Sequence, residues 1–169
     1  FKDKIEYLII EDEPKDISNN INNLSEIKRK NSLLRIEKSY DTIMNSIQNF
    51  ADNDLICLSD NDEIPNFESK HFINSKNDIF IFEQLFFYYK FNLFYDLIPW
   101  YGTKACKKKR LLSMSWLRNL KNKKYPVWRL DTYFSKLKQT NLQIVKNGGW
   151  HFTNIKTAED IFTKLSNFG

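Results

Sequence analysis

The stretch LICLSDNDEIPN, residues 55–66, holds the two features that decide the expected fold. Its apolar beginning predicts a short buried strand at Leu55–Leu58. Three carboxylates then follow within four residues, at Asp60, Asp62 and Glu63. Because neighbouring carboxylates repel each other and resist burial, we expect a positive group beside the end of this strand.

The order of the flanking segments predicts an α/β fold. Residues 5–10 (IEYLII) are typical of a buried strand, and apolar residues at helical spacing predict a helix over residues 33–50. A strand, a helix and a second strand in this order indicate parallel pairing, which places residues 59–63 just beyond the carboxyl end of a strand. Open α/β sheets bind their ligands at that edge, so the acidic turn is a candidate binding site.

The middle of the chain gives weaker signals of secondary structure. Residues 79–93 favour a strand but exceed the usual strand length, so a break is expected near Glu83 and Gln84. Residues 100–129 are less regular, apart from a short helix expected over residues 113–120.

Two signals stand near the end of the chain. Leu142–Val145 predicts a short strand. Thr157 and Asp160 have the capping-box form, an N-cap hydroxyl followed three residues later by a carboxylate, and so predict a helix. This helix is expected to gather three apolar side chains on one face, those of Ile161, Leu165 and Phe168.

Composition limits the class of protein. A hydrophobic fraction of 41%, with 14 Phe and 8 Tyr, indicates a folded, aromatic-rich interior. No apolar run approaches the roughly 20 residues of a membrane-spanning helix, and the charged start does not resemble a signal peptide. Cys57 and Cys106 form no disulfide framework and lack metal-ligand spacing, so a reducing compartment is expected. We therefore expect a cytoplasmic protein, with peripheral attachment at the inner face of a membrane left open.

The basic residues concentrate in one part of a chain whose net charge is +5. They gather in residues 104–129, and residues 107–110 form the densest run. Such a run can meet the phosphates of nucleic acid, lipid headgroups or a nucleotide, or it can be a solvated loop. Because the densest acidic cluster follows a core strand, nucleic acid is not the expected partner.

Asp60 and Asp62 form the first candidate site. On an extended turn, residues two apart project the same way, so both carboxylates can reach one ligand. Hard oxygen ligands at this spacing suit Mg²⁺ or Mn²⁺, which would bridge the two carboxylates to a diphosphate. The alternative is an acidic turn that caps the following helix, and a bare D-x-D pattern does not decide between the two.

Two further groups of residues could carry chemistry. Gly148 and Gly149 permit close backbone approach, Trp150 offers a flat face for a sugar, and His151 can bind metal, contact phosphate or transfer a proton. A hairpin turn with a structural Trp and His is the alternative. Arg118 has a planar guanidinium suited to phosphate, against the alternative of an ordinary surface helix.

These groups, in this order, resemble glycosyltransferase family 17, which includes the β-1,4-mannosyl-glycoprotein β-1,4-N-acetylglucosaminyltransferase. Residues 59–65 (SDNDEIP) are similar to the family's hallmark S-D-x-D-E-I-P, and residues 147–153 (NGGWHFT) to its G-G-W-H-F-S motif. Residues 100–103 (WYGT) resemble its W-x-G segment, and Leu117-Arg118 its recurring L-R pair. The resemblance covers nearly the whole chain.

The resemblance implies a fold and an activity. The fold would be a single GT-A-like domain over residues 1–169, a Rossmann-type mixed sheet flanked by helices, truncated at both ends and lacking its first strand. The activity would be that of a metal-dependent inverting glycosyltransferase, which moves a sugar, GlcNAc in the first place, from UDP-GlcNAc to a glycan acceptor. Mn²⁺ or Mg²⁺ would be the cofactor, with no nucleic-acid partner and no transmembrane segment.

The resemblance also implies roles for individual residues. Asp62 would be the direct metal ligand, and Asp60 would meet the donor's ribose or a metal-bound water. Glu63 would position the donor sugar or support the catalytic base. His151 would contact the metal or the diphosphate or act in catalysis, and Trp150 would pack against donor or acceptor.

Two further positions bear on how the donor would bind. Arg118 would offset charge on the leaving diphosphate. Tyr40-Asp41 stands where the family often carries Gln-Arg, which reverses a charge near the expected donor site. The second hypothesis is a non-catalytic, degenerate transferase fold that binds anionic glycan, lipid or nucleic acid through residues 104–129.

Overall fold

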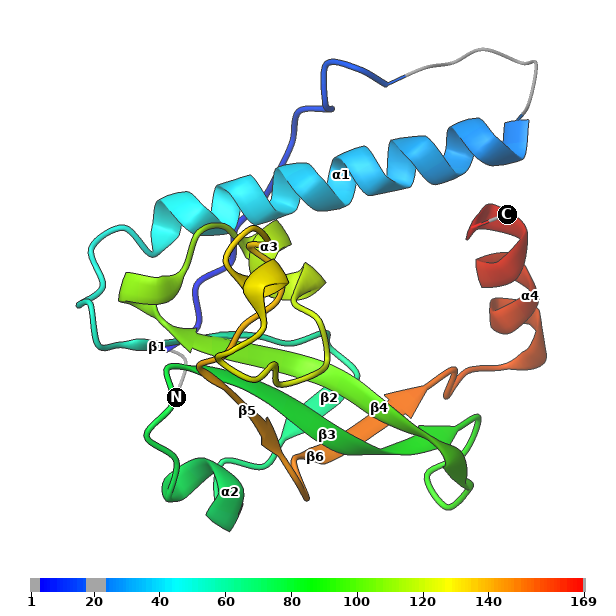
Figure 1. The fold of residues 1–169 in the computed structure, drawn as a ribbon. Helices are drawn as coiled ribbons and strands as arrows, with labels where there is room; N and C mark the ends of the chain where they lie inside the picture. Colours follow the sequence, from blue (N-terminus) through cyan, green and yellow to red (C-terminus); the bar gives the residue numbers. More distant parts are fainter. Residues whose placement is uncertain (1–3, 18–23, 169) are drawn as a thin grey trace. The chain divides into compact units, whose positions relative to one another are not determined.

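The computed structural model describes residues 4–17 and 24–168 of this chain. These residues form two compact units. The larger unit, residues 50–156, contains the β-sheet, and the smaller unit combines the chain up to residue 49 with the chain from residue 157 onward. Figure 1 labels the helices and strands of both units. None of the helices in the described part of the chain is long and apolar enough to cross a bilayer.

The larger unit is built on a mixed six-stranded sheet. Its strands are β1 (Leu55–Leu58), β2 (Glu63–Pro65), β3 (Ile79–Tyr88), β4 (Phe94–Lys107), β5 (Leu142–Val145) and β6 (Gly149–Thr153). They follow the order β1-β4-β3-β6-β2, and β5 also pairs with β3. The β3–β4 pair is antiparallel, whereas β5 and β6 both run parallel to β3. The expected α/β class with a mixed sheet and helices is confirmed, and Figure 1 shows that the long β3–β4 pair curls.

The core lies on both faces of β3. Ile79 and Ile81 are fully buried in a cluster with residues of α3 (Met114–Asn119). Phe80 and Phe82 alternate to the other face, where both rings contact Phe72 of α2 (Lys70–Ile73). Successive side chains of a strand point to opposite faces, so the apolar run of β3 needs a cover on each side. The helices α2 and α3 supply that cover.

The prediction that β1 belongs to a unit of parallel strands is wrong. The strand itself is present with the predicted bounds, but it pairs antiparallel with β4, Leu55 opposite Lys107 and Leu58 opposite Lys104. Residues 100–129 were expected to be largely irregular, whereas the long strand β4 ends in their first part. Because β4 follows β3 through a hairpin, it occupies the edge of β3 and presents its own far edge to β1.

The break expected in residues 79–93 is a change of register, not the end of a strand. β3 continues to Tyr88, with irregularities of its pairing with β4 between Ile81 and Glu83 and between Gln84 and Phe86. A β-bulge bends a strand and lets it stay paired, which explains how a strand of this length fits the curled sheet.

β5 and β6 lie one after the other along the same edge of β3. β5 pairs with residues 79–82 and β6 with residues 85–88. Between them Asn147 has a φ of 52°, and the Gly148 amide donates to the Glu83 carbonyl at 2.9 Å. The predicted strand at Leu142–Val145 is therefore confirmed, and β6 adds a strand that forms part of the glycine-rich motif.

The smaller unit contains two helices, α1 (Leu24–Ser46) and α4 (Ala158–Phe168). The helix predicted over residues 33–50 is present, but it begins and ends earlier than expected. The helix predicted from Thr157 and Asp160 is confirmed with Thr157 as its N-cap: the Asp160 amide donates to Thr157 Oγ1 at 3.2 Å, and that hydroxyl donates to the Asp160 carboxylate at 2.9 Å. The side chain of Phe168 lies outside the described residues.

The buried strand predicted at residues 5–10 is wrong. These residues are exposed and belong to none of the described strands, with Tyr7 82% exposed. An apolar run forms a strand only where a partner satisfies its backbone groups, and local composition cannot supply that partner. Nearby, Glu13 forms an ion pair with Arg35 of α1 at 3.0 Å, and Asp12 contacts Lys38.

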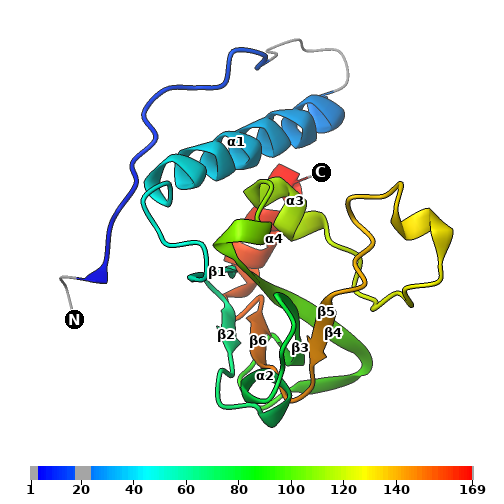
Figure 2. The same ribbon diagram turned by 60° about the vertical axis from the view of Figure 1, so that its left-hand side comes forward.

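Two short 3₁₀ turns complete the described elements, η2 (Lys108–Arg110) after β4 and η3 (Leu130–Thr132) in the long connection between α3 and β5. Figure 2 shows this connection, coloured yellow, extending away from β4 and β5.

The pairing of β2 with β6 depends on Gly149. Its φ is +118°, and an added Cβ would lie 2.0 Å from the Ile64 carbonyl oxygen. Gly149→Ala is therefore expected to lower the free energy of unfolding by roughly 2 kcal/mol or more, measured by urea denaturation. Ile64→Ala is the control on the partner strand, expected to cost less than about 1 kcal/mol because Ile64 is half exposed. Equal stability of Gly149→Ala and wild type would contradict this close approach.

Candidate functional site

The acidic turn joins β1 to β2, the first and the last strand in the order of the sheet. The Glu63 amide donates to the Asp60 carbonyl at 3.1 Å, which closes the turn. Glu63 then enters β2 and lies opposite His151 of β6 in the antiparallel register. The Phe152 amide also donates to the Asp62 carbonyl at 2.9 Å. The two sequence motifs that stand far apart along the chain are thus neighbours in the sheet.

The carboxylate of Glu63 is buried and held by hydrogen bonds. One oxygen accepts from the Trp100 indole N–H at 3.0 Å. The other accepts from the Thr103 hydroxyl at 3.2 Å and from the Asp60 amide at 3.3 Å. Three donors on one buried carboxylate compensate for its removal from water, so Glu63 anchors the turn to β4.

β4 leaves room for this carboxylate at Gly102. An added Cβ there would lie 2.4 Å from Glu63 Oε1 and 2.2 Å from Gln84 Oε1. The neighbouring Thr103 hydroxyl accepts from the Gln84 amide at 3.2 Å and lies 2.7 Å from the Ser59 hydroxyl. A polar network is therefore built inside the sheet directly beneath the acidic turn.

His151 packs against aromatic rings beside the turn. Its ring stacks on Trp100 with centroids 4.2 Å apart and planes 4° apart, and on Phe86 at 5.1 Å. Its Nδ1 lies 3.6 Å from Asp62 Oδ1, which is the distance of an ion pair when the ring is protonated and is too long for a hydrogen bond. Only 4% of His151 is exposed, so it contacts the turn from within the protein.

Arg118 supplies the positive group that the sequence predicts beside the carboxylates. Its guanidinium donates to Asp60 Oδ2 at 2.7 Å. It lies near the end of α3, a helix that begins where the Ser113 hydroxyl accepts from the Trp116 amide at 2.9 Å. The local N-cap signal and the salt bridge together bring this Arg to the acidic turn.

Lys104 fixes the end of α3 from inside the sheet. Its ammonium donates to the carbonyls of Arg118 and Leu120, each at 2.7 Å. Lysines are favourable at helix C-termini, where carbonyls lack partners within the helix. Burial, together with the nearby charge of Arg118, lowers the pKa of Lys104 from its usual 10.5 to about 8. Lys104 therefore connects β4 to the position of Arg118.

An open cavity of about 380 Å³ lies beside these groups, within the size range of ligand pockets. Its charged lining residues are Glu63, Lys104 and Arg118. Trp100, Tyr101 and Gly102 of β4 form another part of its wall. The cavity thus has two cationic side chains in its wall, with the hydrogen-bonded carboxylate of Glu63 beside them.

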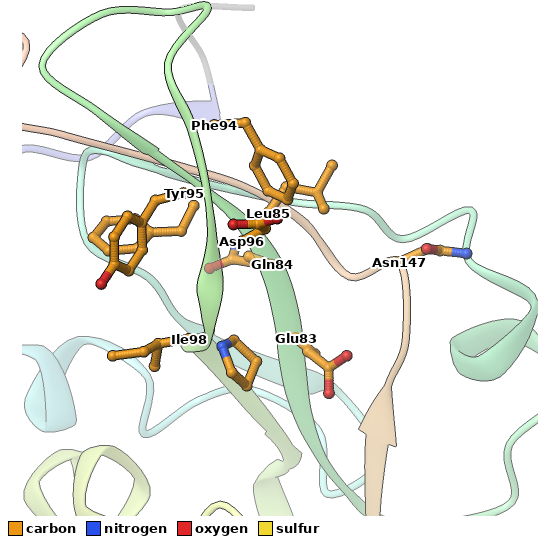
Figure 3. Close-up of a pocket in the computed structure, with 10 residues that line it drawn as sticks. Glu83, Gln84, Leu85, Phe94, Tyr95, Asp96, Ile98 and Asn147 are labelled. Atoms are coloured by element: carbon orange, nitrogen blue, oxygen red, sulfur yellow. The ribbon is translucent and has the colours of Figure 1, made fainter.

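A second cavity of about 200 Å³ lies along β3 and the first half of β4. Figure 3 shows residues that line it, among them Glu83 and Gln84 of β3, Tyr95 and Asp96 of β4, and Asn147. None of the predicted site residues is in its lining. The cavity of about 380 Å³, whose lining includes Glu63 and Arg118, is therefore the candidate site.

The structure brings five of the six predicted site residues together and separates the sixth. Asp60, Asp62, Glu63, His151 and Arg118 are connected by the contacts described above. Trp150 precedes His151 in β6 and points to the opposite face of the sheet because strand residues alternate. Its cross-strand partners there are the exposed residues Ile64 and Leu85.

The densest basic run serves local structure. Lys107 forms an ion pair with Asp78 at 2.8 Å. The ammonium of Lys108 donates to the Phe50 carbonyl at 2.5 Å, and that of Lys109 to the Asn53 side chain at 3.2 Å. These contacts hold the turns before β1 and after β4.

The carboxylates fit a metal ion that brings its own ligands. Among residues 4–17 and 24–168, no group of three or more His, Cys, Asp or Glu side chains is arranged to hold a metal. Mg²⁺, however, is usually bound by one or two carboxylates together with substrate phosphates and water. Arg118 contacts Oδ2 of Asp60 and His151 approaches Oδ1 of Asp62, so the second oxygen of each carboxylate can serve such an ion.

Comparisons of the chain with protein-family models, curated proteins and solved structures gave no match. The assignment to a glycosyltransferase family therefore rests on the sequence resemblance alone. The chemistry of the site has to be argued from its own contacts.

The sequence interpretation gives three residues of the site no individual role: Trp100 and Thr103, which belong to the W-x-G segment, and Lys104, which begins the basic stretch 104–129. Each meets the acidic turn or Arg118 through a contact made across the sheet. The signal that could have found them is a run of polar residues inside a buried strand, since Thr103 and Lys104 are both buried in β4. Buried polar side chains need partners, and here the partners are the site.

The salt bridge between Asp60 and Arg118 is expected to add little to stability. About a third or more of each side chain is exposed, so solvent screens the pair. A double-mutant cycle of Asp60→Asn and Arg118→Gln should give a coupling free energy of about 0.2–1 kcal/mol, measured by urea denaturation. A coupling of several kcal/mol would show instead that the pair serves the fold.

Lys104 should make stability depend on pH. Its pKa is about 8 in the folded chain, below the usual 10.5, so between these values the unfolded chain binds more protons and stability rises with pH. The free energy of unfolding of wild type minus that of Lys104→Met should therefore increase from about pH 8 to pH 10.5. Urea denaturation across this range measures it, with the exposed Lys70→Met as matched control. A difference that stays constant with pH would contradict the buried ammonium.

Proposed function

We propose that this chain is a metal-dependent inverting glycosyltransferase that moves a sugar, GlcNAc as first candidate, from a UDP-sugar to a glycan acceptor. The observation that carries the proposal is the pairing of the acidic turn with the strand of the Gly-Gly-Trp-His motif. Glu63 lies opposite His151, and Asp62 lies 3.6 Å from that ring. Under this proposal the sheet is a variant of the GT-A type.

The partly exposed carboxylates would hold the metal and the donor. Asp62 and Asp60 would be its protein ligands, through the oxygens that His151 and Arg118 do not contact. When bound, the cation would neutralise the diphosphate and so stabilise it as a leaving group.

Arg118 and Lys104 would act on the same leaving group. Both line the cavity of about 380 Å³, where their positive charges can offset the charge that develops as the sugar leaves the diphosphate. Lys104 also holds the end of α3, so its contact with the Arg118 carbonyl would set the position of that charge.

Glu63 and His151 are better suited to positioning than to contact with substrate. Glu63 already accepts three hydrogen bonds, and His151 is 4% exposed. Both would hold the turn that carries Asp60 and Asp62. Preorganisation of this kind lowers the cost of binding a charged donor.

At the start of the basic stretch, in residues 104–108, the contacts favour the transferase over a non-catalytic binding module. Lys104, Lys107 and Lys108 each bind a group of the protein itself. A surface for anionic polymers would instead present such lysines to solvent.

Binding of Mn²⁺ and UDP tests the site. Ligands at about 100 times their Kd should stabilise the folded protein by roughly 2.7 kcal/mol, seen as a rise in Tm. Asp62→Ala should abolish the rise, whereas Asn61→Ala, a change at an exposed neighbour in the same turn, should keep it. No rise in wild type, or a rise that survives Asp62→Ala, would refute the metal and nucleotide site.

Donor hydrolysis tests the activity separately. UDP release should be measured over a panel of UDP-sugars, with Mn²⁺ and with EDTA. Release that requires the metal and is lost in Asp62→Ala supports a transferase, while binding without any release supports a module that only holds the nucleotide.

A further inference from the structure

The connection between α3 and β5 presents an unusual set of side chains to solvent. Within eight residues of this connection, five large apolar side chains are between 69% and 91% exposed: Val127, Trp128, Leu130, Tyr133 and Phe134. Such concentrated exposure is uncommon on a soluble domain and marks an interaction surface. We refer to residues 121–138 as the aromatic loop.

The aromatic loop is ordered, and hydrogen bonds connect its two ends. The Lys121 amide donates to the Leu137 carbonyl at 3.1 Å, and the Tyr125 amide to the Gln139 carbonyl at 3.2 Å. The Trp116 indole, from α3, donates to the Lys136 carbonyl at 2.7 Å and fixes the base to the core. Figure 2 shows the loop extending from the sheet in yellow.

Polar contacts hold the loop together and leave its apolar side chains outside. Asp131 accepts from Arg129 at 2.7 Å and also pairs with Lys138. The Arg129 guanidinium lies 5.2 Å from the centre of the Tyr125 ring. Folding normally buries large apolar side chains, whereas in this loop five of them stay exposed.

The net charge of the loop equals that of the whole chain. Residues 121–138 contain six basic residues and one acidic residue, and the net charge of the whole chain is +5. The single carboxylate, Asp131, is already paired within the loop. Four of the lysines are exposed around the apolar side chains: Lys121, Lys123, Lys124 and Lys136.

We propose that the aromatic loop docks on an anionic lipid surface. Trp128, Tyr133 and Phe134 would enter the boundary between headgroups and acyl chains, with Val127 and Leu130 beside them. The surrounding lysines would meet anionic headgroups, each lysine near the surface adding to the attraction. Positive charges and exposed apolar side chains occur in the same segment, and binding to an anionic lipid surface uses both.

A lipid surface fits these side chains better than nucleic acid does. Single-stranded nucleic acid stacks its bases on aromatic faces along a basic groove. Val127 and Leu130 offer no face for stacking, yet they are as exposed as the aromatic residues. The docking surface is independent of the transferase proposal, because it involves none of the residues assigned to the donor.

Co-sedimentation with vesicles tests the proposal. Wild type should bind vesicles of phosphatidylcholine with phosphatidylglycerol, and bind vesicles of phosphatidylcholine alone more weakly. Trp128→Ser/Phe134→Ser should lower the partition coefficient by about tenfold or more. Phe91→Ser/Leu97→Ser is the matched control, since it removes two apolar side chains of similar exposure from the β3–β4 hairpin and its strand, and it should bind like wild type.

The remaining outcomes overturn the proposal. It fails if wild type does not bind the anionic vesicles, or if the loop variant binds them as well as the control does. Tighter binding to a single-stranded oligonucleotide that the loop variant loses would assign the loop to nucleic acid. Self-association that the loop variant abolishes, without vesicle binding, would assign it to a second copy of the chain. Circular dichroism should show that both double variants keep the fold.

Discussion

The buried carboxylate of Glu63 is the constraint on which the candidate site depends. A charge taken out of water is stable only with several donors. Here the donors come from two places: Trp100 and Thr103 of β4, and the backbone of Asp60 in the turn. β4 must therefore run beneath the turn, and Gly102 must lack a side chain for the carboxylate to fit. The positions of Asp60 and Asp62, the partly exposed carboxylates of the same turn, therefore depend on this buried one.

Elements with a complete local signal could be predicted from the sequence. β1 and β5 are short apolar runs between turns, α3 has a serine N-cap, and α4 has its capping box. The pairing of strands could not be predicted in this way, because it depends on partners far along the chain. The second half of β4 breaks the usual pattern by burying Thr103 and Lys104, and the exposed apolar run at residues 5–10 shows the opposite failure.

In the candidate site too, local motifs could be predicted from the sequence and contacts between distant segments could not. The acidic turn and the histidine strand could be recognised as separate motifs, and Arg118 as a residue suited to phosphate. That Lys104 holds Arg118 in place, or that Trp100 covers His151, depends on contacts across the sheet that no local spacing contains. Trp150 shows the limit of motif reasoning, since it is adjacent to His151 in sequence and points to the other face of the sheet.

The two parallel strands on one edge of β3 behave as a single strand with an interruption between them. β5 is fixed by the core at its buried ends, Leu142 and Val145, and β6 carries the histidine of the site. The number of residues between them determines which side chains of β6 point to the face of the sheet that carries the site. Evolution could lengthen the loops around this sheet freely, but a single insertion or deletion at residues 146–148 would exchange the faces of Trp150 and His151, placing an indole under the acidic turn.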